Sequence, residues 1–181
     1  CGFIACIYAA ASKYEKAVIA ILIAIVLDGL DGRVARKFNA TSKFGLELDS
    51  FSDLVSFGVA PALLMYHWCF RPLANEFGVL AVFVYALCAA SRLARFNISA
   101  ENLKSFTGLP TPGAAVMVVA VVNVSPVPLP SYLNLIMGTT LMLVMAYLMI
   151  SKIEFFSIKL LRMRTLGFFP RVVLGLLIWA L

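Results

Sequence analysis

Long apolar runs, separated by short polar joins, follow one another along the whole chain. A helix needs about 20 mostly apolar residues to cross the hydrocarbon core of a bilayer. The hydrophobic pattern predicts seven helical segments, the first of them short, at residues 1–12, 15–35, 45–69, 74–96, 111–125, 131–150 and 166–181. Proline and glycine mark the joins, as at Pro72 and in the stretches 108–112 and 125–130. The pattern therefore predicts an all-α fold, a polytopic membrane helix bundle.

The composition supports this class of protein. Hydrophobic residues make up 62% of the chain and charged residues only 13%, which is far from the usage of a soluble domain. We interpret residues 1–181 as a single integral-membrane domain whose two ends, both within apolar runs, are compatible with trimming. A net charge of +6 on a soluble protein would suggest a nucleic-acid partner. On a membrane protein it indicates cytoplasmic loops and anionic lipid headgroups, so we expect membrane lipids and no nucleic acid as partners.

The basic residues are distributed unevenly between alternate joins. The joins after the second, fourth and sixth segments, with the adjoining helix ends, carry eleven of them: Arg33, Arg36, Lys37, Lys43, Arg92, Arg95, Lys104, Lys152, Lys159, Arg162 and Arg164. The opposite joins carry only Lys13, Lys16 and Arg71. Because cytoplasmic loops are enriched in Lys and Arg, the eleven are expected to face the cytoplasm. The sequence thus predicts a protein of the cell (plasma or inner) membrane whose second and third segments meet on the cytoplasmic side.

Four aspartates are concentrated at this meeting point. Asp28 and Asp31 share one helix face because residues three apart are neighbours on a helix, and Gly32 and Ala35 share that face. Gly45, Asp49 and Asp53 do the same on the next segment. A carboxylate in the bilayer costs about 2.5–3.5 kcal/mol even on the mildest scale. The two short-linked helices should be antiparallel neighbours, so we expect one cup of four carboxylates that is neutralised by positive charge.

The chemistry of the predicted cup favours a divalent metal. Carboxylate oxygens without Cys or His suit Mg²⁺, Mn²⁺ or Ca²⁺ and argue against zinc or copper. Four carboxylates can hold two ions about 3.5–4 Å apart, as in sites for phosphoryl displacement. The small residues Gly32, Ala35 and Gly45 leave room for a base or a pyrophosphate, and Arg36 at the rim suits a phosphate. The alternative is an interfacial network of salt bridges to Arg33, Arg36, Lys37 and Lys43.

The motif Asp-x-x-Asp-Gly-x-x-Ala-Arg-x8-Gly-x3-Asp-x3-Asp, at residues 28–53, resembles the signature of the CDP-alcohol phosphotransferases. The resemblance implies an enzyme, often a homodimer, with a six-helix core, here with an extra C-terminal helix, that transfers a substituted phosphate from a CDP-linked donor to an alcohol and releases CMP. It implies that Asp28, Asp31 and Asp49 ligate metal, and that Asp53 contributes to the metal site and acts as the general base. It also implies contacts to the CDP-linked donor from Gly29, Gly32, Ala35, Arg36, Ser42 and Gly45.

Three further stretches, 48–61, 90–97 and 106–112, resemble the serine-specific branch of this family. This resemblance implies that the donor is CDP-diacylglycerol, that the acceptor is the hydroxyl of L-serine, and that the products are phosphatidylserine and CMP. Serine carries a carboxylate, so its pocket needs a cation. Arg92 and Arg95 lie three apart, with Asn97 beyond them, and one arginine is expected to bind the carboxylate and the other a phosphate. The alternative is that both arginines anchor the helix at the interface.

Two other functions are compatible with the same sequence. The first is the same reaction with another acceptor, such as glycerol 3-phosphate or inositol phosphate. The second is a divalent-cation transporter with the aspartates in its ion pathway, although transporters commonly place the ion site near the midplane between inverted repeats. Glu47, which points roughly opposite Asp49, is expected to make a helix–helix or dimer contact and not to join the cup.

Overall fold

The computed structural model describes residues 1–37, 43–71, 76–99, 108–124 and 132–151, and of the side chains in these ranges those of 32–37, 43 and 99 are left out. All regular structure in this part of the chain is helical, which confirms the predicted all-α class. The elements, in order, are α1 (Gly2–Ala10), α2 (Tyr14–Lys37), α3 (Lys43–Asp53), η1 (Leu54–Val59), α4 (Ala60–Met65), η2 (Tyr66–Phe70), α5 (Glu76–Ser99), α6 (Thr111–Val124) and α7 (Tyr132–Ile150). Six predicted segments correspond to these helices within a few residues, and the seventh, 166–181, lies outside the described residues.

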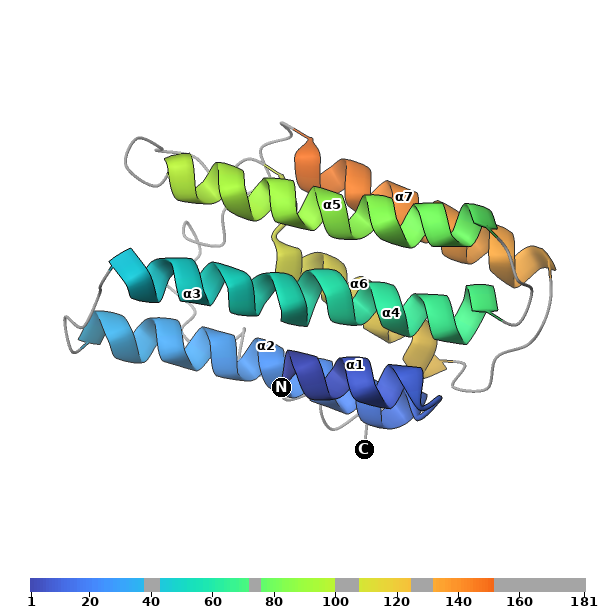
Figure 1. The fold of residues 1–181 in the computed structure, drawn as a ribbon, viewed down its shortest axis with the longest axis horizontal. Helices are drawn as coiled ribbons and strands as arrows, with labels where there is room; N and C mark the ends of the chain where they lie inside the picture. Colours follow the sequence, from blue (N-terminus) through green and yellow to red (C-terminus); the bar gives the residue numbers. More distant parts are fainter. Residues whose placement is uncertain (38–42, 72–75, 100–107, 125–131, 152–181) are drawn as a thin grey trace, which may run out of the picture.

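The bundle is organised around one long helical rod that runs from α3 through η1 and α4 to η2. The short α1 and the longer α2 lie along one side of the rod, and α5 with α7 lies along the other (Figure 1). The remaining helix, α6, contacts α2, η1 and α4. Successive helices run in opposite directions, so that α2 ends where α3 begins (Figure 1). We call this end of the bundle the aspartate end, because it carries Asp28, Asp31, Asp49 and Asp53.

The first π-helical stretch of the rod, η1, follows directly after Asp53. Its backbone is underwound and holds one extra residue in the turn, since the N–H of Ala60 bonds to the carbonyl of Val55, five residues earlier. Pro61 has no N–H and cannot donate to the carbonyl of Phe57, as an α-helix would require. The fully buried Tyr85 of α5 donates its hydroxyl to that carbonyl instead, at 3.1 Å. A side chain from the neighbouring helix therefore replaces the missing backbone donor.

The second stretch, η2, follows the same principle at the opposite end of the rod. The N–H of Arg71 bonds to the carbonyl of Tyr66 and not to that of His67, which would be its α-helical partner. The hydroxyl of Tyr14, at the start of α2, donates to the carbonyl of His67 at 2.9 Å. Backbone groups freed within a membrane helix need such replacements because lipid offers no hydrogen bonds. The two tyrosines thus fix α2 and α5 on opposite sides of the rod.

Length and apolar character identify three candidate membrane spans among the described residues: Phe44–Phe70, Glu76–Ile98 and Tyr132–Ile150. Large apolar side chains are exposed on them, such as Phe83 at 60% and Tyr147 at 69%. In water such surfaces would favour aggregation, whereas in a bilayer they face lipid. The helix α6 has 14 residues, about 21 Å at the rise of an α-helix, and is shorter than the hydrocarbon core. These features support an integral membrane protein.

Candidate functional site

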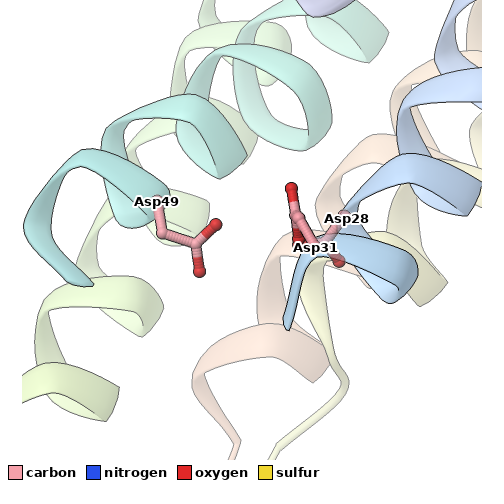
Figure 2. A group of neighbouring side chains, drawn as sticks. All are labelled: Asp28, Asp31 and Asp49. Atoms are coloured by element: carbon pink, nitrogen blue, oxygen red, sulfur yellow. The ribbon is translucent and has the colours of Figure 1, made fainter. Parts of the chain in front are cut away.

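Three aspartates from two helices converge at the aspartate end. Asp28 and Asp31 project from one face of α2, and Asp49 projects toward them from α3 (Figure 2). One carboxylate oxygen of each lies within 4.8 Å of the others. Asp28 is partly buried, while Asp31 and Asp49 are exposed. The three-residue spacing on α2 aligns the first two carboxylates, and the antiparallel approach of α3 supplies the third from the opposite side.

Asp53 completes the group from the next turn of the rod. It is partly buried, and its carboxyl group lies within hydrogen-bonding reach of that of Asp28. The charges of Asp28, Asp49 and Asp31 all act on Asp53, so the four acids form one electrostatically coupled cluster. Acids this close together repel one another and favour the binding of positive charge between them.

The residues of the cluster fit divalent metal ions. The donor set consists of carboxylate oxygens, the ligands that Mg²⁺, Mn²⁺ and Ca²⁺ prefer. Oxygens from two different helices, all within 4.8 Å of one another, are close enough to bind one ion together. The exposed carboxylates of Asp31 and Asp49 leave the cluster accessible to an ion and to a phosphate ligand.

Small residues near the cluster leave space for a larger ligand. Among the described residues, a methyl group added at Gly29 would meet no atom of another helix within 4 Å, so the surface of α2 is open at this point. Gly45, on α3, is exposed. Gly32, Ala35 and Arg36 belong to α2, but their side chains are among those left out, and Ser42 lies outside the described residues. The donor contacts predicted for these six residues stay predictions.

Arg92 reaches the same region from α5. Asp53 is close enough to attract its guanidinium electrostatically. One terminal nitrogen, Nη1, donates to the hydroxyl of Thr111 at 3.3 Å, at the start of α6. The buried Nε of Arg92 has no hydrogen-bond partner within the described part of the chain. Arg92 therefore lies near Asp53 with a donor still available.

The other two residues of the predicted serine or phosphate pocket bond to neighbouring helices. Arg95 donates from Nη1 to the carbonyl of Ile150, the last residue of α7, at 3.1 Å. Asn97 bonds to two side chains of α3, those of Glu47 and Ser50. The two arginines thus contact different helices, and Arg92 interacts electrostatically with Asp53 of the aspartate cluster. The contact of Glu47 is a helix–helix contact, one of the two kinds predicted.

Comparison with known proteins decides the family. A model of the CDP-alcohol phosphatidyltransferase family matches residues 1–151, which include all four aspartates. The chain belongs to the CDP-alcohol phosphatidyltransferase family. The match extends from α1 to the end of α7, so the family assignment covers the whole described bundle.

Relatives of this CDP-alcohol phosphatidyltransferase come from bacteria, archaea and yeast. The chain is 46% identical over 123 residues to a CDP-diacylglycerol–serine O-phosphatidyltransferase of Helicobacter pylori, and the aligned region covers 65% of the chain and 50% of that relative. It is 38% identical over 156 residues to the protein of that name from Bacillus subtilis, with 86% of the chain and 82% of the relative covered. An archaetidylserine synthase of Methanothermobacter thermautotrophicus is 37% identical over 158 residues, with 85% of the chain and 64% of that relative covered. The chain spans about half the length of the Helicobacter relative.

Two residues that contact predicted site residues of this protein were not predicted from its sequence. Thr111 is 1% exposed and holds Arg92, yet the sequence analysis gave it no role. The available signal was a threonine directly before Pro112 at a helix start, since threonine is favoured at the N-cap and proline at the first helical position. Ser50 was missed as well, and its contact with Asn97, 47 positions along the chain, leaves no local signal.

Proposed function

We propose that this protein transfers the phosphatidyl group of CDP-diacylglycerol to the hydroxyl of L-serine, forming phosphatidylserine and releasing CMP. The observation that carries the proposal is the cluster of four aspartates from α2 and α3 in a chain of this family. The names of relatives that are 46% and 38% identical support serine as the acceptor.

Asp28, Asp31, Asp49 and Asp53 would together hold two divalent ions, Mg²⁺ or Mn²⁺, with Ca²⁺ as a further ion that fits the oxygen ligands. When bound, such ions neutralise charge on the pyrophosphate of the donor and on the departing CMP. The open surface at Gly29 and the exposed Gly45 support a position for the CDP part beside the cluster. In this proposal, Gly32, Ala35, Arg36 and Ser42 also contact the CDP part of the donor.

Asp53 acts as the general base in this proposal. It accepts the proton of the serine hydroxyl while the serine oxygen forms a bond to the phosphorus that carries diacylglycerol. The bond between that phosphorus and the bridging oxygen of the pyrophosphate breaks, and CMP leaves with the electron pair. The partly buried position of Asp53, below the exposed pair Asp31 and Asp49, supports this division of roles.

Arg92 binds the carboxylate of serine in this proposal. Its attraction to Asp53 supports a position near the base, and its Nε, which has no hydrogen-bond partner among the described residues, is a donor suited to a carboxylate. A serine held there by its carboxylate would present its hydroxyl toward Asp53. Arg95 and Asn97, which contact α7 and α3, are not assigned to the serine contact.

We further propose that the aspartate end faces the cytoplasm at the cell membrane. Arg92 and Arg95 belong to the C-terminal part of α5, which ends at the aspartate end, whereas the start of α2 and the end of η2 lie at the opposite end (Figure 1). Lys13, Lys16 and Arg71 are next to these two opposite ends in sequence, which agrees with the enrichment of cytoplasmic loops in basic residues. The homodimer implied by the family resemblance stays a prediction.

The test is the release of CMP from CDP-diacylglycerol by the full-length protein in detergent, with Mg²⁺ or Mn²⁺. L-Serine, glycerol 3-phosphate and inositol phosphate are compared as acceptors. We expect release that depends on serine and on the metal, and that falls by about 10²- to 10⁴-fold in Asp53→Asn because the general base is lost. Glu15→Gln is the matched control, since Glu15 is an exposed acid in the first turn of α2, at the far end of the bundle.

The outcomes separate the three functions. Release with glycerol 3-phosphate or inositol phosphate, but not with serine, would keep the reaction type and discard the acceptor. Metal uptake into vesicles without CMP release from any acceptor would favour the transporter. An Asp53→Asn variant as active as Glu15→Gln would remove the general-base role from Asp53.

A further inference from the structure

A polar contact between α3 and α5 lies beside the aspartate cluster. The amide nitrogen Nδ2 of Asn97 donates to Oε2 of Glu47 at 3.3 Å, and the hydroxyl of Ser50 donates to Oδ1 of Asn97 at 3.1 Å. The same hydroxyl lies 3.1 Å from the carbonyl oxygen of Leu46 in its own helix. Both ends of one amide on α5 therefore engage α3. We call Asn97, Glu47 and Ser50 the α3 clamp.

The α3 clamp holds the part of α3 that carries Asp49. Glu47 precedes Asp49 by two residues and Ser50 follows it directly. The apolar side chains on this stretch do not form a core, since Phe44 is 77%, Leu48 57% and Phe51 66% exposed. Apolar surface that faces lipid fixes neither the rotation of a helix nor its distance from a neighbour, because lipid is as apolar as the side chains. Directional hydrogen bonds can fix both.

The helix that carries Asn97 is well anchored. α5 packs along α7, and Tyr85 ties it to η1. Arg95, two residues before Asn97, bonds to the carbonyl at the end of α7. The clamp therefore joins the exposed end of α3 to the anchored helix α5. The rotation of α3 about its axis sets the direction in which Asp49 points across to Asp28 and Asp31 (Figure 2).

We propose that Asn97 is a positioning residue for the metal centre and acts through Glu47 and Ser50 to hold Asp49 opposite α2. The inference deepens the proposed function and rests on its metal site. It differs from a role in serine binding, because both ends of the amide are engaged by α3.

The test measures Mn²⁺ binding to the full-length protein in detergent by electron paramagnetic resonance, without substrate. Wild type should bind Mn²⁺ and Asp31→Asn should not, which tests the metal site itself. Asn97→Ala, Ser50→Ala and Glu47→Ala should each weaken binding by about 3- to 10-fold, the size expected from the loss of one hydrogen bond. The serine KM, measured at saturating Mn²⁺, should stay within about twofold of wild type.

Matched variants separate the clamp from general effects. Glu47→Gln removes the charge but keeps an acceptor for Asn97, so it should bind Mn²⁺ more tightly than Glu47→Ala. Ser50→Thr keeps the hydroxyl and should restore binding lost in Ser50→Ala. Ser91→Ala is the control for Ser50→Ala, because Ser91 is exposed on α5 and donates to its own helix at Leu87. If the two residues act through one contact, adding Glu47→Ala to Asn97→Ala should weaken Mn²⁺ binding further only by the charge effect that Glu47→Gln shows.

Three results would overturn the proposal. A raised serine KM in Asn97→Ala with unchanged Mn²⁺ binding would make Asn97 a substrate contact. Weaker binding in Asn97→Ala, with wild-type binding in both Glu47→Ala and Ser50→Ala, would remove the route through α3. A wild-type protein that binds no Mn²⁺ would overturn the metal site of the proposed function and the clamp together.

Discussion

Neutralising one aspartate of the cluster should have opposite effects on stability with and without metal. Asp31 is exposed, and its carboxylate lies within 4.8 Å of those of Asp28 and Asp49. Two unit charges at 4.8 Å repel by about 0.9 kcal/mol in water and by about 3.5 kcal/mol at an effective dielectric constant of 20. Asp31→Asn removes the repulsion of Asp31 with Asp28 and with Asp49, which together amounts to about 2 kcal/mol in water. Salt at physiological strength reduces it to about 1 kcal/mol.

The assay is thermal unfolding of the full-length protein in detergent, in EDTA and in saturating Mg²⁺. In EDTA, Asp31→Asn should unfold a few degrees above wild type because the repulsion is relieved. In Mg²⁺, wild type should gain about 2.7 kcal/mol when the free ion is 100-fold above its Kd, whereas the variant has lost a ligand and should gain much less. The order of the two midpoints should therefore reverse. Glu15→Gln, remote from the cluster, should match wild type in both conditions.

A lower midpoint for Asp31→Asn than for wild type in EDTA would refute the argument, since it would mean that Asp31 makes a favourable contact in the metal-free protein. A Mg²⁺-dependent rise of full size in the variant would show that Asp31 is not a ligand. Either result would also weaken the proposal for the reaction.

Two further predictions concern α5. Arg92→Lys should raise the serine KM by about 10- to 150-fold, because a charge-assisted hydrogen bond is lost, and leave the CDP-diacylglycerol KM nearly unchanged. Steady-state kinetics with each substrate varied in turn would check this. Equal effects on the two KM values would contradict it. Tyr85→Phe should lower the free energy of unfolding by about 1 kcal/mol, because the carbonyl of Phe57 loses its donor. Adding Pro61→Ala restores a backbone N–H and should recover part of this loss in urea unfolding, whereas a further loss in the double variant would exclude the compensation.

Much of the site could be predicted from local spacing. Asp28 and Asp31 are three apart on one helix, so the geometry of the α-helix places them on one face. The short join to the next segment makes α2 and α3 antiparallel neighbours, which brings Asp49 and Asp53 to the same end of the bundle. These relations depend on residues close in sequence, and the structure shows the four carboxyl groups together.

The contacts of α5 could not be predicted in the same way. Arg92 and Arg95 lie three residues apart, but their partners differ: one bonds to Thr111 on α6 and the other to the end of α7. A spacing of three residues determines that two side chains lie near each other on a helix, but it does not determine which neighbouring helix each one reaches. That choice depends on how α5 is rotated against α6 and α7.

The sequence by itself determined the membrane class, the helix bounds within a few residues and the acidic cluster, because apolar length and helical spacing are local properties. Only the tertiary structure decided that Tyr14 and Tyr85 complete the two π-helical stretches of the rod and that Asn97 bonds to α3. These contacts join helices that are distant in sequence. Their partners are set by the rotation and depth at which the helices pack, and the hydrophobic pattern of a single helix surrounded by lipid does not specify either quantity.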